Sequence, residues 1–482
     1  MTVVDTVGIT TATSSGAGAF TELDNSKVTK FQYKIMFISG MGFFTDAYDL
    51  FIIGVVVALL TTQWNLSTGQ VSLLNSVTLA ASAVGAIVFG RIADIFGRRK
   101  IYGFEVLILA IGAIASALSP NYVFLLVSRI ILGIGIGGDY PVSATIMSEY
   151  SGTKSRGRMV GLVFAMQGAG LVVGPFIAAI LLASHMSTGI TWRILLGLGA
   201  IPGLAVFYLR RQLNETPCFA LAGGDPAEAQ AAIAAATGQA ASKGPRAASK
   251  ARHQQSAFAG FRTIGRNRQM LLWIIGTAGA WAMLDFAYYG NTISSPEVLK
   301  AINPNGSLLY NTTLQLLIFA VFALPGYALA IRLLDKSGRK KIQCLGFSMM
   351  AVAFYLIGFV PGVSSHVAPF VIIFGMSYFF TEFGPNTTTF IYPAEIFPVE
   401  VRTTGHGISA AAGKLGAFAG AFLFPTMLAS SFGLRGAEIV AGTVCLVGLC
   451  LTLWLLPEPK GLSLEQIEET AYSPRAGASG VK

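Results

Sequence analysis

The chain has 482 residues, of which 53% are hydrophobic and only 12% are charged, whereas soluble globular domains carry roughly 25% charge. At about 20 apolar residues per membrane span, this composition supplies about twelve spans and leaves little for a soluble core. It therefore indicates a polytopic membrane protein and argues against a cytosolic enzyme. The net charge of +10 does not require a nucleic-acid partner if the basic residues occupy one set of loops.

The chain begins with a polar stretch rich in Thr, Ser and Gly that lacks the basic and apolar segments of a removed signal peptide. We therefore expect residues 1–30 to form a retained, disordered tail. Twelve apolar stretches follow, each long enough to cross a membrane as a helix. They cover residues 31–61, 70–92, 101–119, 121–148, 158–184, 191–209, 268–294, 308–332, 342–361, 367–394, 403–430 and 434–456.

The sixth and seventh stretches are separated by residues 211–267, whose Ala-rich centre, residues 220–250, contains no aromatic side chain. This composition is typical of a linker. We therefore predict an N-terminal six-helix lobe over residues 31–210 and a C-terminal six-helix lobe over residues 268–457. A second cytoplasmic tail would follow over residues 458–482.

The loops after even-numbered helices hold most of the Lys and Arg residues, and the odd-numbered loops hold only Arg193, Lys300 and Arg435. Because Lys and Arg are enriched in cytoplasmic loops, we expect the even loops and both termini in the cytoplasm. The membrane would be a plasma membrane or a bacterial inner membrane. The four cysteines are scattered, with no CxxC pair and no His spacing that suits a metal, so we expect no disulfide framework and no metal site.

The two halves repeat each other at two motifs. Gly97 and Gly338 stand in similar Asp-x-x-Gly-Arg sequences 241 positions apart, and Glu149 and Glu395, each seven residues before an Arg, lie 246 positions apart. Because the two motifs recur at nearly the same sequence separation, they indicate duplication of a six-helix unit, as in many secondary transporters. Taken singly, the arginines could be topology signals only. The residues that we expect to control conformational change are Asp94, Gly97, Arg98, Arg99, Arg129, Glu149, Arg156, Asp335, Gly338, Arg339, Glu395 and Arg402.

Several segments resemble a known family. The between-helix signature G-x-x-x-D-x-x-G-R-R/K is matched by Gly90, Asp94, Gly97, Arg98 and Arg99, and it resembles the major facilitator superfamily. Within that superfamily the chain is similar to the phosphate:proton symporters in its first, fourth and tenth helices, at residues 42–51, 137–141, 383–390 and 392–395. The resemblance implies an all-α fold of two pseudo-repeated six-helix lobes. One departure is Glu382, where relatives commonly have a neutral residue.

Acidic residues inside the predicted helices are functional candidates, because a charge near the bilayer centre costs about 3 kcal/mol or more. We predict that Asp46, Asp49 and Asp139 form a proton route on the N-terminal lobe. The alternative is that these acids make only helix-packing hydrogen bonds. Asp285 and Glu382 are the acids of the other lobe. Glu105 lies near a helix end, and we expect its carboxylate to reach the membrane surface.

A polar and aromatic stripe marks the seventh helix, where Trp281, Asp285 and Tyr289 recur at every fourth residue. The aromatic pair alone would more often be a packing contact, and a lone Gln167 could simply bond a neighbouring helix. The resemblance implies that the stripe lines a central phosphate site. Its full set of binding residues would be Tyr140, Gln167, Trp281, Asp285, Tyr289, Asn386 and Lys414.

Hydroxyl, amide, indole and ammonium groups are the donors that a phosphate anion needs. Asp285 is then the acid expected to couple proton and phosphate binding. Lys414 would pair with Asp285 in the empty protein and be released when that acid is protonated. A fixed structural ion pair is the alternative.

These residues favour a symporter that imports inorganic phosphate with protons by alternating access. An organic acid or sugar symporter of the same superfamily is one alternative, and a phosphate-sensing receptor without net transport is another. We expect phosphate and protons as transported species, membrane lipids as partners, and no nucleic acid or cofactor. An enzyme is not expected, since no Ser/His/Asp set, metal cluster or phosphate-cradling loop is present.

Overall fold

The computed structural model describes residues 21–238 and 258–472, and every regular element in these ranges is helical. Twelve helical segments of the described chain are long and apolar enough to cross a membrane. The predicted all-α fold with twelve spanning segments is therefore confirmed. Most of the predicted N-terminal tail (residues 1–20), part of the linker (239–257) and the last ten residues (473–482) lie outside the described residues.

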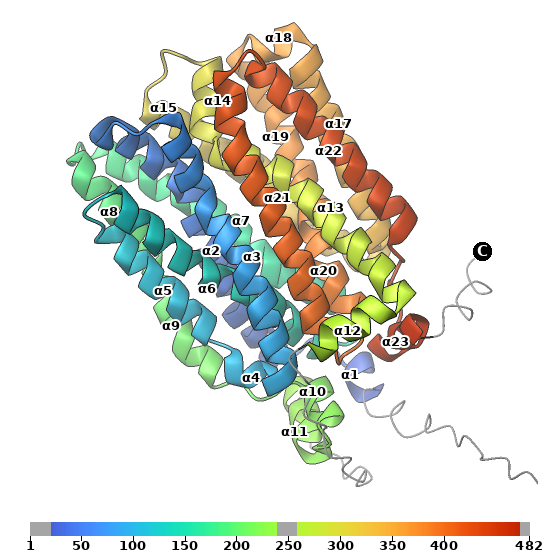
Figure 1. Cartoon of the computed structure of the whole chain (residues 1–482). Coiled ribbons are helices and arrows are strands. Elements are labelled where there is room, and N and C mark those ends of the chain that lie inside the picture. Colours follow the sequence, from blue (N-terminus) through green and yellow to red (C-terminus); the bar gives the residue numbers. More distant parts are fainter. Residues whose placement is uncertain (1–20, 239–257, 473–482) are drawn as a thin grey trace, which may run out of the picture.

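The first six spanning segments form one lobe and the last six form a second lobe beside it (Figure 1). The first lobe contains α2 (Lys30–Trp64), α3 (Thr68–Phe96), α4 (Arg98–Ile101) with α5 (Phe104–Ala117), α6 (Tyr122–Glu149), α7 (Arg156–Ala183), and α8 (Thr188–Leu198) with α9 (Ala200–Arg211). The second contains α13 (Arg268–Ile293), α15 (Leu308–Ile318) with η1 (Phe319–Ala323) and α16 (Leu324–Ser337), α17 (Arg339–Phe359), α19 (Val367–Phe383) with α20 (Pro385–Ile396), α21 (Arg402–Ala429) and α22 (Gly433–Leu455).

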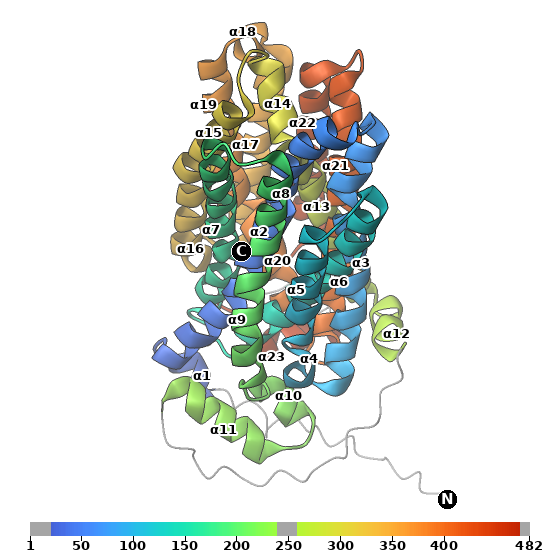
Figure 2. The same cartoon turned by 90° about the vertical axis from the view of Figure 1, so that its left-hand side faces the viewer.

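Short helices cover one end of the bundle, which carries both the first and the last described helix and which we call the termini end (Figure 2). They are α1 (Thr21–Asn25), α10 (Pro217–Ala222), α11 (Pro226–Thr237), α12 (Ala259–Arg266) and α23 (Leu464–Tyr472). The opposite end, the far end, carries α14 (Ser295–Ile302) and α18 (Pro361–Ser364) (Figure 1). The ranges predicted as tails and linker thus include helices.

Helix α11 shows why part of the linker folds. Asp225 accepts a hydrogen bond from the Glu228 amide at 2.9 Å, Pro226 occupies the first turn, and Gly238 ends the helix with a φ of +72°. These are the usual start and stop residues of a helix. The Ala-rich interior has a high helix propensity, which composition alone does not distinguish from a flexible linker.

A tight turn after the second spanning segment recurs after the eighth. Gly97 and Gly338 have φ angles of +103° and +90°, a region that side chains with a Cβ rarely adopt. Each turn is followed at once by a new helix, α4 in the first lobe and α17 in the second. The predicted internal repeat is therefore visible in the backbone.

The tenth spanning segment is broken between α19 and α20, where the sequence suggests one continuous helix. Pro385 lacks an amide hydrogen and disfavours a helical conformation at the residue before it, and Gly384 has φ −103° and ψ −112°. The break brings Glu382, at the end of α19, beside Asn386, in the first turn of α20. Both side chains are buried.

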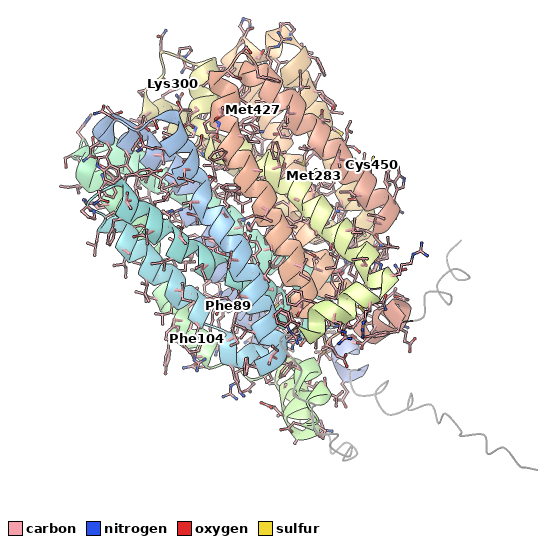
Figure 3. All side chains as sticks on the ribbon, in the orientation of Figure 1. Phe89, Phe104, Met283, Lys300, Met427 and Cys450 are labelled. Carbon is pink, nitrogen blue, oxygen red and sulfur yellow. The ribbon has the colours of Figure 1, made fainter. Side chains whose placement is uncertain are left out.

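The outer surface of the bundle is apolar, and its polar residues are collected inside. Large apolar side chains such as Phe104 are exposed along the outside, at 46% for that residue, as expected of a surface that faces lipid (Figure 3). Between the lobes, α3 and α21 approach closely at Gly90 and Gly407. The two lobes therefore pack backbone against backbone at this point of their interface.

Candidate substrate and proton site

Lys414 of α21 stands at the lobe interface and is 1% exposed. Its Nζ donates hydrogen bonds to Tyr140 OH at 3.0 Å and to Tyr289 OH at 2.9 Å, and lies 3.7 Å from Asp285 Oδ2. Tyr140 belongs to α6 of the first lobe, and the other two partners belong to α13 of the second. One buried ammonium thus connects both lobes and a carboxylate.

The predicted stripe on α13 faces this ammonium. Trp281, Asp285 and Tyr289 are each 1% exposed, and their spacing of four residues places them on one helix face. The Trp281 ring lies 6.0 Å from that of Tyr140 across the lobe interface. Phe390 of α20 contacts both rings, at 6.4 and 6.2 Å, and was not anticipated because an apolar aromatic residue usually indicates only a packed core.

A second polar cluster links the lobes through amide groups. The Tyr327 hydroxyl of α16 donates to Gln167 Oε1 of α7 at 2.7 Å, and Asn386 Nδ2 lies 3.1 Å from the same oxygen. Asn386 also donates to Glu382 Oε2 at 2.5 Å. The Gln167 Nε2 group has no hydrogen-bond partner among the described residues, which leaves a buried donor for an anion. Tyr327 is a further residue that the sequence did not single out.

Asp139 of α6 is part of an ion-pair cluster on the first lobe. Arg210 of α9 donates to Asp139 Oδ1 at 2.7 Å and Oδ2 at 3.0 Å, and to Glu105 Oε1 at 2.8 Å. All three side chains are buried, so the expectation that Glu105 reaches the membrane surface is wrong. The carboxylate turns inward because its oxygens accept from the Gly103 amide at 2.8 and 2.9 Å and from Arg210. Two acids share one guanidinium at this site.

Asp46 and Asp49 are fully buried on α2, and their carboxylate oxygens have no hydrogen-bond partner among the described residues. Asp46 lies within electrostatic range of Asp139 and Arg210 as well as of Lys414, and so of charged groups from both clusters. Arg129 is the cation near Asp49, and it donates to the Asp49 backbone carbonyl at 2.9 Å. Arg129 therefore lies inside the first lobe, apart from the other residues expected to control conformational change.

Those other residues form two related networks at the termini end. In the first lobe Arg98 pairs with Asp94 at 3.2 Å and with Glu149 at 3.3 Å. In the second, Arg339 pairs with Asp335 at 3.0 Å and with Glu395 at 2.7 Å. The sequence repeat is thus also a repeat of ion pairs.

Contacts between the two networks close the termini end. Arg402 of the second lobe pairs with Glu149 of the first at 2.9 Å, and Thr404 donates to Asp94 through its amide at 2.7 Å and its hydroxyl at 2.6 Å. Arg156 of the first lobe donates to the Leu462 carbonyl at 3.3 Å, near the C-terminal α23. The lobes are therefore locked together on this side of the centre.

Each turn is also held by an acid that the sequence analysis missed. Glu215 accepts from the backbone amides of Arg98 and Arg99 at 3.2 and 3.3 Å, and Glu458 accepts from those of Arg339 and Lys340, both at 3.0 Å. Burial raises the pKa of the Glu215 carboxyl, while the Thr216 amide, the Arg98 guanidinium and the Arg99 amide oppose that rise. Each acid follows the last spanning helix of its lobe, and this common position is the signal that could have identified the pair.

The sequence and fold were compared with known proteins. A family model described as "Sugar (and other) transporter" matches residues 29–471. The chain belongs to this transporter family. A probable inorganic phosphate transporter 1-6 of Arabidopsis thaliana is 34% identical, covering 92% of this chain and 95% of its own. A low affinity inorganic phosphate transporter 1 of Petunia hybrida is 35% identical, covering 93% of this chain and 94% of its own.

Solved structures agree on the fold of this transporter family member. A proton:xylose symporter of the major facilitator superfamily, bound to 6-bromo-6-deoxy-D-glucose, has a TM-score of 0.76 at 20% identity, over 92% of this chain and 99% of that one. An inward open xylose transporter from E. coli has a TM-score of 0.63 at 19% identity, over 91% of this chain and 99% of that one. The predicted superfamily, the similarity to phosphate symporters and the assignment as a transporter and not an enzyme are confirmed.

Proposed function

We propose that this protein is a proton-coupled symporter that imports inorganic phosphate by alternating access of two lobes to a central site. The observation that carries the proposal is the donor set around Lys414. The Lys414 ammonium and the hydroxyls of Tyr140 and Tyr289 meet at the lobe interface, and the unpartnered Gln167 amide lies in the second polar cluster across the same interface. Such a set suits a small oxyanion, because every group except Asp285 can donate a hydrogen bond to it.

Asp285 is the proposed coupling acid. In the empty site its carboxylate faces Lys414, and a phosphate anion that binds Lys414 would be repelled by that carboxylate. Protonation removes the repulsion and supplies a donor, so proton and phosphate favour each other's binding. By thermodynamic linkage the two effects are equal in free energy.

The proposed proton route on the first lobe runs through Asp46, Asp49 and Asp139. Asp46 lies within electrostatic range of Lys414 and of the Asp139–Arg210 pair. Arg210 then joins this group as the cation that pairs with Asp139. A proton leaving the centre would pass from Asp46 toward the termini end.

We also propose how the protein is oriented in the membrane and where its lobes begin and end. Positive residues dominate the loops at the termini end, so this end would face the cytoplasm of a plasma membrane or bacterial inner membrane. The functional body would comprise residues 31–210 and 268–457, with 211–267 as the connection. Residues 1–30 and 458–482 would be cytoplasmic.

Reconstitution into vesicles tests the function. With an inward proton gradient, labelled phosphate should accumulate above its external concentration, and collapse of the gradient should release it. Excess sugar or organic acid should leave phosphate uptake unchanged. If either one inhibits uptake by competition, that compound and not phosphate would be assigned as the substrate. Saturable phosphate binding without any accumulation would instead identify a receptor.

A further inference from the structure

Glu382 is a buried acid at the lobe interface with no cation among its described neighbours. Asp285 faces Lys414, Asp139 faces Arg210, and Arg129 lies near Asp49. No ion pair formed within the described residues includes Glu382, although its side chain is 0% exposed. A carboxylate taken out of water without a cation is costly, unlike the neutral acid.

The groups that face Glu382 can bond either form but cannot neutralise a charge. Asn386 of α20 donates a hydrogen bond to Glu382 Oε2, and the hydroxyls of Tyr288 of α13 and Tyr327 of α16 are close by. Glu382 Oε1 has no hydrogen-bond partner among the described residues. The charged group that acts on Glu382 electrostatically is Asp285, which is another acid. Tyr378, on the same helix as Glu382, is also within electrostatic range. An ionised Glu382 would thus be buried against a like charge.

The Asn386 amide connects Glu382 to the lobe interface. Its Nδ2 has two hydrogens and three acceptors within reach, namely Glu382 Oε2, Gln167 Oε1 and the Tyr327 hydroxyl at 3.0 Å. A charged acceptor binds a donor about twice as strongly as a neutral one. Ionised Glu382 therefore competes with Gln167, a residue of the other lobe, for Asn386.

We propose, on the basis of the phosphate transport proposed above, that Glu382 must be neutral for the two lobes to close over the central site. It acts as a positioning residue and a protonation checkpoint on the conformational step, and does not carry the transported proton. Lys414 can balance one negative charge, which is Asp285 in the empty protein and phosphate in the loaded one. Whether the closed protein is empty or loaded with phosphate, Lys414 is already paired and no cation is left for Glu382. Glu382 therefore keeps its proton through the whole transport cycle.

Protons then have two separate roles in transport, and a measurement of phosphate uptake alone does not distinguish them. The proton on Asp285 determines whether transport is coupled, and the proton on Glu382 determines whether the lobes can close at all. Phosphate–phosphate exchange, with equal pH on both sides of the vesicle, requires closing but no net proton transfer. Exchange is therefore the measurement that isolates Glu382.

At saturating phosphate, where the pH-dependent affinity set by Asp285 no longer limits the rate, we expect exchange by the parent protein to fall at alkaline pH by about tenfold per pH unit, as for one titrating acid. Glu382→Gln keeps a neutral amide beside Asn386, so its exchange should lose this alkaline decrease. Glu438→Gln is the matched control, since Glu438 is an equally buried acid of the same lobe that bonds Asn291 at 3.4 Å. This control should retain the decrease.

An unchanged alkaline decrease in Glu382→Gln would overturn the proposal. If that variant does not fold, Glu382→Asp tests the same claim, because it keeps the acid and must keep the decrease; a flat profile there would also overturn it. An Asp285→Asn protein that retains both exchange and its alkaline decrease supports the separation of roles. A parent that exchanges no phosphate at all would reject the proposed function itself.

Discussion

Asp285 and Lys414 form a single ion pair that balances the charge of the central site. Asp285→Asn resembles the protonated acid in shape and charge, so phosphate binding and exchange should persist while uptake against a gradient is lost. Phosphate affinity in this variant should also depend less steeply on pH than in the parent, because the coupling acid no longer titrates. Binding measured across pH on purified protein, beside vesicle uptake, checks both statements. An equally steep pH dependence would move the coupling proton to another acid.

Gly42 shows how narrowly the Asp139–Arg210 pair is accommodated. A Cβ on Gly42 would lie 1.8 Å from Asp139 Oδ2 and 2.1 Å from an Arg210 guanidinium nitrogen. Gly42→Ala should therefore separate the buried pair, at a cost of about 3 kcal/mol or more, and abolish accumulation. Thermal unfolding in detergent and vesicle uptake measure the two effects. Gly69→Ala is the control, because nothing lies within 4 Å of its added Cβ, and it should behave like the parent.

The site residues differ in how visible they are in the sequence. Trp281, Asp285 and Tyr289 could be grouped because a spacing of four residues fixes one helix face. Arg210 and Glu105 could not, since near a helix end the sequence does not say whether a long side chain points to the surface or inward. Tyr327 and Phe390 look like ordinary core residues until the two lobes are brought together.

At the scale of elements, spanning helices were predictable and their interruptions were not. Length and hydropathy identify all twelve spans, because a membrane permits few alternatives to a continuous helix. The break before Pro385 and the short α14 depend on tertiary contacts. A linker and an Ala-rich surface helix such as α11 have the same composition, and only capping residues distinguish them.

Helix α14 sits between the lobes at the far end, and Figure 3 shows Lys300 there. Openings of about 460 and 470 Å³ flank the helix, and both are lined by Glu297 and Lys300. Burial raises the pKa of the Glu297 carboxyl from 4.5 to about 7, whereas Lys300 opposes that rise. The packed helix therefore favours the protonated acid.

The stability of α14 should decrease as the pH rises, because the packed helix favours protonated Glu297. The stabilisation of α14 by neutral Glu297 is complete below pH 4.5 and is lost as the pH rises through about 7. Amide hydrogen exchange of α14, corrected for its intrinsic pH dependence, should thus speed up across this range in the parent. Glu297→Gln should remove the transition. A transition of the same size in the variant would assign the loosening to another group.

At the scale of the whole molecule, the closed termini end depends on bonds between the lobes. Arg402→Gln removes the pair with Glu149 and leaves a buried carboxylate with less compensation, a change worth about 3 kcal/mol or more. The equilibrium should shift by a factor on the order of 100 toward opening at this end. Spin labels at Lys100→Cys and Lys341→Cys, one on each lobe, should move apart.

The control for this shift is Arg435→Gln at the far end. Arg435 donates to the Gly358 carbonyl at 2.8 Å and to the Phe359 carbonyl at 3.4 Å, both within the second lobe. Its removal should leave the label distance unchanged. If Arg402→Gln also leaves the distance unchanged, the ion pair with Glu149 does not hold the lobes closed.

The paired carboxylates Glu215 and Glu458 have a consequence for biosynthesis. Each accepts the backbone amides that begin the third helix of its lobe, yet each is translated only after the sixth. In a growing chain those amides stay uncapped until the whole lobe has left the ribosome, and the first lobe is completed before the second is made. In each half, therefore, the cap on the third helix can form only after the sixth helix has been made.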